Sequence, residues 1–215
     1  MKNIAIAIDG PAASGKSRVA RRVAEDLGYV FVNSGAMYRA FAWQAVQAGI
    51  DVTDESQVLT LLADTKFECG ECEGVGTVLV NGVDPGEALT EDAVNSTVSA
   101  IATYPEVRER LVAAQRAYLD HCNVVMEGRD IGTVVFADTP YKFYIDASPE
   151  VRAQRRKAQG IVDSIADRDR QDSTRKASPL VAAEGAEVVD SSELDLEQVV
   201  SRVLGKLREQ GLVSE

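Results

Sequence analysis

The sequence predicts an α/β fold in which a parallel sheet is flanked by helices. Three observations predict it: short apolar runs alternate with helical patterns along the 215 residues, the first run passes through a glycine-rich turn into a helix, and several runs end in polar clusters. Strands that alternate with helices form parallel sheets covered on both faces, with ligands at the carboxyl ends of the strands. The length suits one well-cored domain, so we expect residues 1–215 to form a single domain.

The first predicted elements are a strand, a turn and a helix. Residues 3–8, NIAIAI, form an apolar run without helical spacing, which is typical of a buried strand. Residues 17–28 carry apolar side chains four positions apart and end in a glycine, which favours a helix. The turn between them matches G-x-x-x-x-G-K-[ST] from Gly10 to Ser17. The strand and helix around the motif favour a phosphate loop over a glycine-rich turn that only joins two elements.

This turn has the chemistry of a nucleoside triphosphate site. Its glycines let backbone N–H groups point inward, and the helix N-terminus adds partial positive charge. Lys16 would reach the outer phosphates, and the Ser17 hydroxyl would be a ligand of Mg²⁺. The predicted triphosphate site consists of Gly10, Pro11, Ala12, Ala13, Ser14, Gly15, Lys16 and Ser17.

The later elements continue the alternation. Residues 66–90 differ, because short β segments and glycines replace the helical pattern, and Asn81-Gly82 is a strong hairpin signal. We expect strands over 29–35, 123–130, 141–148 and 186–190, and helices over 36–47, 55–64, 91–102, 105–120, 149–160 and 196–210.

Charge and composition restrict the function classes. The net charge of −11 argues against a general nucleic-acid binder. No apolar run reaches the length of a membrane span, and Asp9 interrupts the first run too early for a signal peptide, so we expect a cytoplasmic protein without a membrane partner. Eight of the 23 lysines and arginines lie between Arg152 and Lys176, against four acids. That segment is either a solvated helix face or a phosphate-binding segment.

The cysteines suggest a metal or redox site only weakly. Cys69 and Cys72 form a C-x-x-C motif, and His121 with Cys122 would complete four zinc ligands. However, adjacent ligands strain a tetrahedral site, and the motif lies in a predicted hairpin tip rather than between a strand and a helix. We therefore assign it no metal.

Two further strand ends carry arginine. Ser34, Tyr38 and Arg39 follow the second predicted strand, and Arg129 and Asp130 end the predicted strand over 123–130. Arginine forks match phosphate oxygens, so these residues indicate a second anion opposite the phosphate loop. A surface ion pair is the alternative for each arginine taken alone.

Five segments, in order and over essentially the whole chain, resemble the bacterial cytidylate kinase family. The segments are IDGPAASGKS, NSGAMYR, PEVRERL, EGRDIGTVVF and RDRQDSTRKASPL. GRDIGTVVF and the R-D-x-x-D-x-x-R run from Arg168 to Arg175 are the most specific of them. The resemblance implies a P-loop nucleoside monophosphate kinase fold with a β-rich monophosphate-binding insert at 64–103 and a helical lid at 150–176.

The resemblance also implies an activity, namely transfer of the γ-phosphoryl group of ATP to CMP or dCMP with Mg²⁺. The acceptor oxygen is already ionised, so no general base is needed, and Lys16, Arg39 and Arg129 would act on the transferred group. We expect a monomer with these nucleotides as its partners. The implied contacts are Arg39, Arg129 and Arg168 with the CMP phosphate; Ser34, Ser99, Arg108, Asp130 and Arg175 with cytosine; Asp172 and Arg168 with ribose; and Arg152, Arg155 and Arg156 with ATP.

The chain departs from the family pattern in a shortened lid and in Arg18, which replaces a common threonine. The carboxylate that supports Mg²⁺ stays open among Asp9, Glu127 and Asp146. A uridylate, adenylate or shikimate kinase would share the loop and lid but lack the GRD and RDRQDSTR segments. A GTP-dependent switch would need an N-K-x-D motif, which this sequence lacks.

Overall fold

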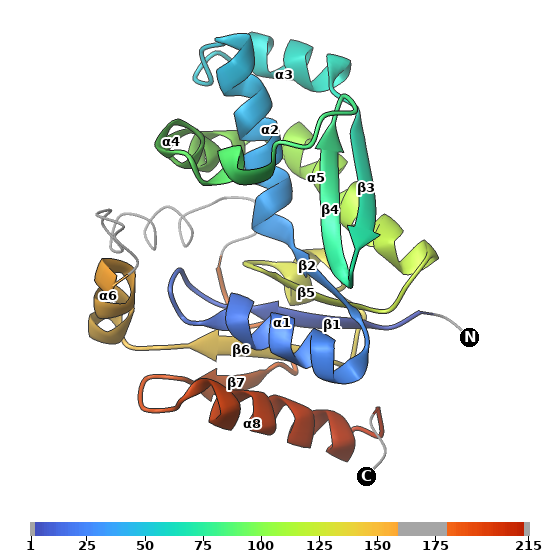
Figure 1. Ribbon diagram of the computed structural model, residues 1–215, viewed down its shortest axis with the longest axis vertical. Coiled ribbons are helices and arrows are strands. Elements are labelled where there is room, and N and C mark those ends of the chain that lie inside the picture. The colour runs from blue at the N-terminus through green and yellow to red at the C-terminus, as the bar shows by residue number, and fades with distance from the viewer. Residues whose placement is uncertain (1–2, 159–179, 213–215) are drawn as a thin grey trace.

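A seven-stranded sheet forms the centre of the computed structural model, which describes residues 3–158 and 180–212 (Figure 1). The strand order is β3-β4-β2-β5-β1-β6-β7, and all neighbours pair in parallel except β3 and β4. The predicted parallel sheet is therefore confirmed, with one antiparallel strand at its edge. The strands are β1 (Ala5–Asp9), β2 (Val30–Asn33), β3 (Phe67–Cys72), β4 (Val75–Val80), β5 (Val124–Gly128), β6 (Lys142–Asp146) and β7 (Glu187–Asp190).

Helices connect these strands in the alternating order that the sequence predicts. The longer helices are α1 (Lys16–Leu27), α2 (Ser34–Ala48), α3 (Glu55–Asp64), α4 (Asp92–Ile101), α5 (Pro105–Arg116), α6 (Pro149–Ala158) and α8 (Leu196–Glu209). Short turns were not predicted from the sequence: the 3-10 turns η1 (Gly86–Thr90) and η2 (Ala117–Asp120), and the π-helical turn η3 (Ile131–Val135).

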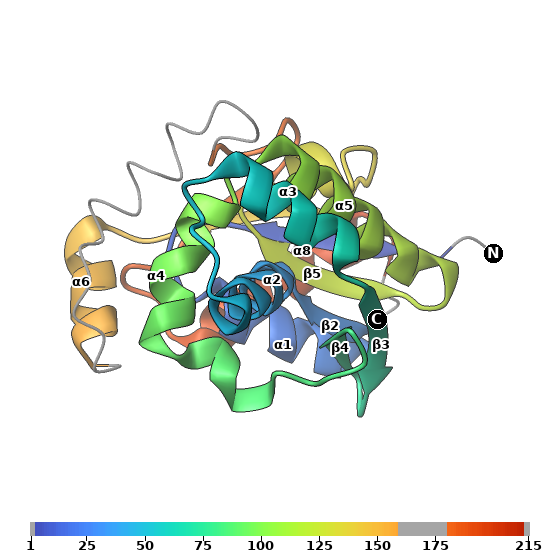
Figure 2. The same ribbon diagram turned by 90° about the horizontal axis from the view of Figure 1, so that it is seen from above.

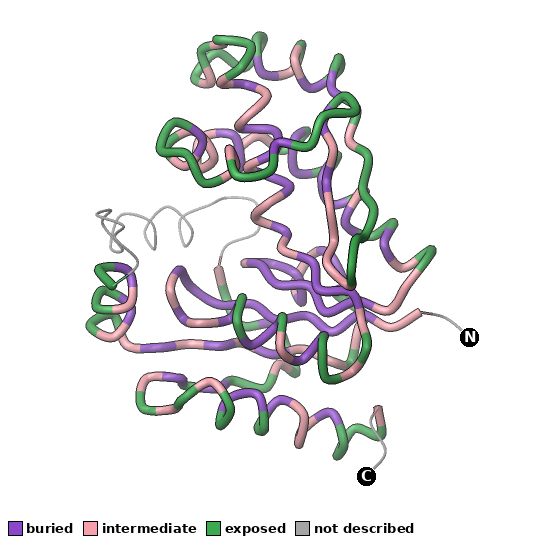
Figure 3. The backbone as a smooth tube through the Cα atoms, viewed as in Figure 1, coloured by how far each residue is buried: buried purple, intermediate pink, exposed green. Residues whose placement is uncertain are grey.

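The sheet separates two hydrophobic clusters. Ile6 and Ile8 of β1 pack with α1 and α8, whereas Ala5 and Ala7 of the same strand face α2 and α5. Alternate side chains of a strand point to opposite faces, so a strand covered on both sides is apolar throughout, as the run NIAIAI predicts. Figure 3 shows the central strands as buried, and the outer face of the helices and strand β3 of the hairpin as largely exposed.

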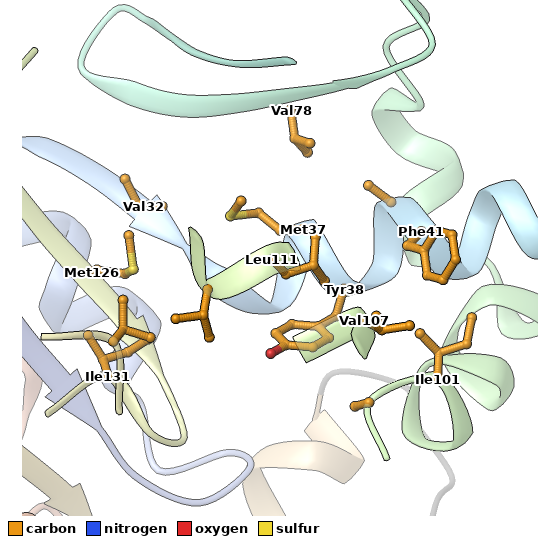
Figure 4. Packing of buried hydrophobic residues seen from close by; sticks show 14 of the residues in the cluster. Val32, Met37, Tyr38, Phe41, Val78, Ile101, Val107, Leu111, Met126 and Ile131 are labelled. Carbon is orange, nitrogen blue, oxygen red and sulfur yellow. The ribbon is translucent and has the colours of Figure 1, made fainter. Parts of the chain in front are cut away.

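Helix α2 connects the sheet to the upper part of the molecule. Figure 2 shows it nearly end-on, between α4 and the β3–β4 hairpin. Its residues Met37, Tyr38 and Phe41 are buried, and they belong to one cluster with Val107 and Leu111 of α5 (Figure 4). This packing holds α2 and α5 side by side, which matters because both helices contribute to the site.

The positions at which β2 and β5 end determine where several predicted site residues lie. The predicted strand over 29–35 ends at Asn33, because the Asn33 side chain accepts a hydrogen bond from the Ala36 N–H and caps α2. Ser34 therefore begins a helix. Likewise β5 ends at Gly128, which leaves Arg129 and Asp130 beyond the strand.

The hairpin prediction is partly wrong. Asn81 and Gly82 do form a tight turn with positive φ, but their flanking residues share a single bridge, because Pro85 has no N–H to continue a strand and η1 follows. The long hairpin turns instead at Glu73 and Gly74, which also have positive φ.

The C-x-x-C motif lies in the second half of β3, and Cys72 pairs with Val75 beside the turn at Glu73 and Gly74, so the predicted hairpin tip is confirmed. Cys69 and Cys72 are three positions apart on one strand, so their side chains point to opposite faces of the hairpin. Within residues 3–158 and 180–212 no group of three His, Cys, Asp or Glu side chains is placed to hold a metal ion.

No helix within the described part of the chain is long and apolar enough to cross a bilayer. Of the predicted lid, the residues up to Ala158 are described; Arg168, Asp172 and Arg175 lie outside the described residues.

Candidate active site

The turn after β1 has the backbone shape of a phosphate cradle. Gly10, Ala13 and Gly15 have φ values of 152°, 61° and 91°. At Gly10 a Cβ atom would lie 2.1 Å from the carbonyl oxygen of Ile145 in β6, so glycine is required there. Alternation of positive and negative φ turns backbone N–H groups toward one side and forms an anion-binding nest. The buried Lys16 Nζ donates to the Pro11 carbonyl at 3.1 Å, folded back over this nest.

Glu127 of β5 lies directly beside the end of the phosphate loop. The Ser17 hydroxyl donates to its Oε1 at 2.8 Å, and Lys16 Nζ lies 3.8 Å from its Oε2. A hydroxyl and a carboxylate are the oxygen donors that a small divalent cation uses, together with water and phosphate oxygens. The residues present therefore fit such an ion, and of the three candidate carboxylates Glu127 is the one that contacts Ser17.

Asp9, at the end of β1, has a different role. It is 2% exposed and accepts two backbone hydrogen bonds, from the Ile131 N–H at 2.8 Å and the Gly132 N–H at 2.7 Å. Burial raises the pKa of this carboxyl to about 6; the two N–H groups oppose that shift, Asp130 adds to it and Lys16 opposes it. Asp9 is thus tied to the turn after β5 rather than to Ser17.

The opposite wall of the site comes from α2, α5 and the turn after β5. The Ser34 hydroxyl donates to the Glu127 carbonyl at 2.8 Å, which fixes the start of α2 on β5. The buried guanidinium of Arg108 donates to the Asp130 carboxylate and lies 5.7 Å from the centre of the Tyr38 ring. These contacts assemble a polar wall from three elements that are far apart in the sequence.

Both walls line one cavity of about 810 Å³, a volume typical of small-molecule sites. Every predicted site residue that the structure describes lines it except Gly10, Pro11 and Arg152. The lining residues that the sequence predicted are Ala12, Ala13, Ser14, Gly15, Lys16, Ser17, Ser34, Arg39, Ser99, Arg108, Arg129, Asp130, Arg155 and Arg156.

The three arginines of α6 are placed differently. Arg155 donates to the carbonyl oxygens of Ser14 at 3.1 Å and Ser191 at 2.7 Å, so it joins the phosphate loop to the segment after β7. Arg156 lines the cavity. Arg152 is buried and donates to the carbonyls of Ala147 and Ala12, so it supports the loop from outside the cavity.

Sequence reasoning missed one part of the cavity wall. Ser191 and the stretch 194–196, together with Val199, line the cavity next to the phosphate loop. The predicted strand over 186–190 ends immediately before them, and the carboxyl ends of parallel strands share one edge of a sheet. That signal could have found these residues.

A phosphate loop and several arginines that line one cavity, at the carboxyl edge of a parallel sheet, define the class of P-loop kinases. The solved structure of a sugar kinase from Janibacter sp. aligns over 99% of both chains with a TM-score of 0.50 and 15% identity, which shows a shared fold. A profile of the cytidylate kinase family matches residues 6–209.

Curated relatives support the same assignment. The chain is 44% identical over 214 residues to the cytidylate kinase of Geobacillus kaustophilus, which covers 94% of this chain and 96% of the relative. It is also 44% identical to the cytidylate kinase of Pelotomaculum thermopropionicum, over 94% and 95% of the two chains. The chain therefore belongs to the cytidylate kinase family, a family of kinases that transfer the γ-phosphoryl group of ATP to CMP or dCMP.

Proposed function

We propose that the phosphate loop holds ATP and that the wall formed by α2, α5 and the turn after β5 holds CMP or dCMP. The observation that carries this proposal is that Lys16 of the phosphate loop lines the same cavity as Arg39 and Arg129, which follow two other strands. Two nucleotides bound in this way bring a donor and an acceptor phosphate together between cations. Positioning and charge neutralisation are what phosphoryl transfer chiefly requires.

On the ATP side, the loop amides and the Lys16 ammonium bind the phosphates. Ser17 and Glu127 would hold Mg²⁺, which would supply positive charge to neutralise the phosphates. Arg155 and Arg156 line the same cavity, and Arg155 donates to the Ser14 carbonyl of the loop. Leu194 and Val199 add apolar surface there, against which a purine base can pack.

On the CMP side, Arg39 and Arg129 bind the phosphate through their guanidinium forks. The Asp130 carboxylate can accept a hydrogen bond from the cytosine amino group. The paired Arg108 donates to a ring acceptor, and Ser34 and Ser99 complete the base site. Because the acceptor phosphate is ionised at neutral pH, the chain's residues hold and orient it and need not remove a proton.

The remaining assignments follow from the resemblance. Arg168, Asp172 and Arg175, which lie outside the described residues, are proposed to contact CMP. The division into an insert at 64–103 and a lid at 150–176 is likewise a proposal; Val98 and Ser99 of that insert line the cavity. A monomeric cytoplasmic enzyme without nucleic-acid or membrane partners stays a prediction.

Two substitutions on opposite walls test the proposal. We expect Lys16→Ala to lower kcat by about a hundredfold or more, the usual effect of removing a group that stabilises transition-state charge. We expect Arg39→Gln to raise KM for CMP by about tenfold, the loss of one charged hydrogen bond, with KM for ATP changed less than about twofold. Steady-state kinetics with each nucleotide varied in turn measures both.

Arg22→Gln is the matched control, because Arg22 forms surface ion pairs with Asp26 and Glu197 on α1 and α8. Circular dichroism confirms that each variant is folded. Near-normal turnover of folded Lys16→Ala, or equal changes of both KM values in Arg39→Gln, would overturn the assignment of the two walls.

A further inference from the structure

We propose that Asp9 and Arg116 are positioning residues that hold the two ends of the turn after β5 and thereby set the affinity for CMP. The proposal rests on the proposed function, in which Arg129 and Asp130 of this turn bind CMP. Neither Asp9 nor Arg116 lines the cavity, so each would act through the turn.

The turn between β5 and β6 has an unusual backbone. Arg129 and Asp130 precede η3, in which the Val135 N–H donates to the Asp130 carbonyl at 3.2 Å and the Phe136 N–H to the Ile131 carbonyl at 2.7 Å. Both bonds span five residues. Single π turns are rare and occur mostly at functional sites. Such a wide turn has polar backbone groups at each end that need partners from elsewhere.

Asp9 supplies the partner at the beginning of the turn. Each of its carboxylate oxygens accepts one N–H, from Ile131 and from Gly132, at 2.8 and 2.7 Å. A Cβ atom on Gly132 would lie 3.3 Å from Asp9 Oδ2 and 3.3 Å from the Ala183 Cβ, so the glycine permits this close approach. Hydrogen bonds to an ionised carboxylate are roughly twice as strong as neutral ones. The bonded N–H groups come directly after Asp130.

Arg116 supplies the partner at the end of the turn. Its Nε donates to the Val135 carbonyl at 2.9 Å and its Nη2 to the Val134 carbonyl at 2.7 Å. The planar guanidinium holds both oxygens in one fixed geometry. Arg116 ends α5, the helix that also carries Arg108, the partner of Asp130. Helix α5 therefore contacts the turn at both of its ends, and Asp9 bonds the beginning of the turn to β1.

This arrangement predicts that substitution of either Asp9 or Arg116 weakens the binding of CMP selectively. Asp9→Asn keeps the shape of the side chain but turns an amino group toward one of the two N–H donors. Arg116→Gln removes the bidentate contact at an exposed position. In both variants the phosphate loop and all cavity-lining side chains are retained.

The experiment measures KM and kcat for both nucleotides, and CMP binding by calorimetry, in Asp9→Asn, Arg116→Gln and Arg116→Lys. We expect KM for CMP to rise about tenfold in Asp9→Asn and severalfold in Arg116→Gln, with KM for ATP changed less than about twofold. The KM for CMP of Arg116→Lys, which keeps the positive charge but has a single donor nitrogen, should lie between the values of wild type and Arg116→Gln. Arg110→Gln, an exposed arginine on the same helix, is the control and should match wild type.

The outcomes separate this proposal from the one it rests on. If Arg39→Gln raises KM for CMP but Asp9→Asn and Arg116→Gln do not, positioning by these residues is wrong and the CMP wall stands. If Arg39→Gln has no effect on CMP either, the CMP wall itself is wrong. A parallel rise of both KM values in Arg116→Gln would indicate a general structural role and would also overturn the proposal. Should Asp9→Asn fail to fold, the two Arg116 variants decide.

Discussion

Glu127, Asp9 and Asp146 lie at or next to the carboxyl ends of three neighbouring strands, and their hydrogen-bond partners differ. Glu127 accepts from Ser17 and lies near Lys16, the environment of a group that supports a cation. Asp9 accepts from two backbone N–H groups inside the protein. Asp146 accepts from the Ala147 N–H at the end of β6. Residues of the same chemical type therefore take distinct roles, because each role depends on which donors face the carboxylate.

Asp9 should make the stability of the protein depend on pH. Its pKa is raised from an ordinary 3.8 to about 6, so the folded state binds more protons than the unfolded state between these values. Stability therefore falls as pH rises through this window, and the cost is fully present above about pH 6. The charged and titratable groups that face Asp9 are Asp130, Lys16 and Tyr144.

The comparison with Asp9→Asn isolates this effect, because the amide does not titrate. Relative to the variant, we expect wild type to lose about 2–3 kcal/mol of unfolding free energy between pH 4 and pH 7, from a shift of roughly two units. Urea unfolding at several pH values measures it. A stability difference that does not change with pH would contradict the raised pKa.

At the scale of elements, the close approach of α2 to β5 assembles the wall that we propose binds CMP. A Cβ atom on Gly128 would lie 2.5 Å from Ser34 Oγ and 2.8 Å from two side-chain carbons of Ile131. The absence of a side chain at Gly128 lets the Ser34 hydroxyl reach the Glu127 carbonyl. The junction of strand, helix and π turn thus depends on one residue without a side chain.

Gly128→Ala should disturb this junction. We expect it to destabilise the fold by about 1–3 kcal/mol, the usual cost of overpacking, and to raise KM for CMP more than KM for ATP. The control is Gly205→Ala in α8, where a Cβ atom would meet no atom within 4 Å. That variant should be more stable than wild type by about 0.5–1 kcal/mol, since alanine favours a helix. Chemical denaturation and steady-state kinetics on both variants give the test; equal stability of Gly128→Ala and wild type would contradict it.

Across the whole molecule, acidic residues are concentrated on residues 51–92, whereas the cavity lining has more basic than acidic residues. Residues 51–92 hold eleven acids and one base, a balance of −10 in a chain of net charge −11, and all eleven acids are exposed. The cavity is lined by seven bases and three acids, a balance of +4. Low-dielectric walls focus such a local field on an entering anion. The cavity therefore has a positive charge balance although the chain as a whole is acidic, and this balance favours the entry of a polyphosphate.

This separation predicts how salt affects catalysis. Above about 0.1 M salt the screening length is about 10 Å or less, so the exposed acids are screened from the cavity while the cavity charges still act at contact. We expect KM for both nucleotides to rise severalfold between 0.1 M and 0.5 M salt, with kcat changed less than about twofold. Parallel series in chloride and acetate separate screening from competition by a specific anion. KM values that stay constant in both salts would contradict the prediction.

The sequence alone predicted the local features of the chain. The glycines of the phosphate loop, the apolar run of β1 and the spacing of α1 each express a preference of neighbouring residues, so the loop and the alternating elements were predicted correctly. The strand-end clusters containing Arg39 and Arg129 were found in the same way, because parallel strands share a carboxyl edge.

Other features depended on contacts between distant segments. Three such features are the contact of Ser17 with Glu127 rather than with Asp9 or Asp146, the position of Arg152 outside the cavity, and the contribution of residues 191–199 to its lining. They follow from strand order and from side chains that meet across more than a hundred positions. The π turn after β5 has no local pattern either, since its partners come from β1 and α5. Local conformational preference is encoded by adjacent residues, whereas the partner of a buried polar group exists only once the chain has folded.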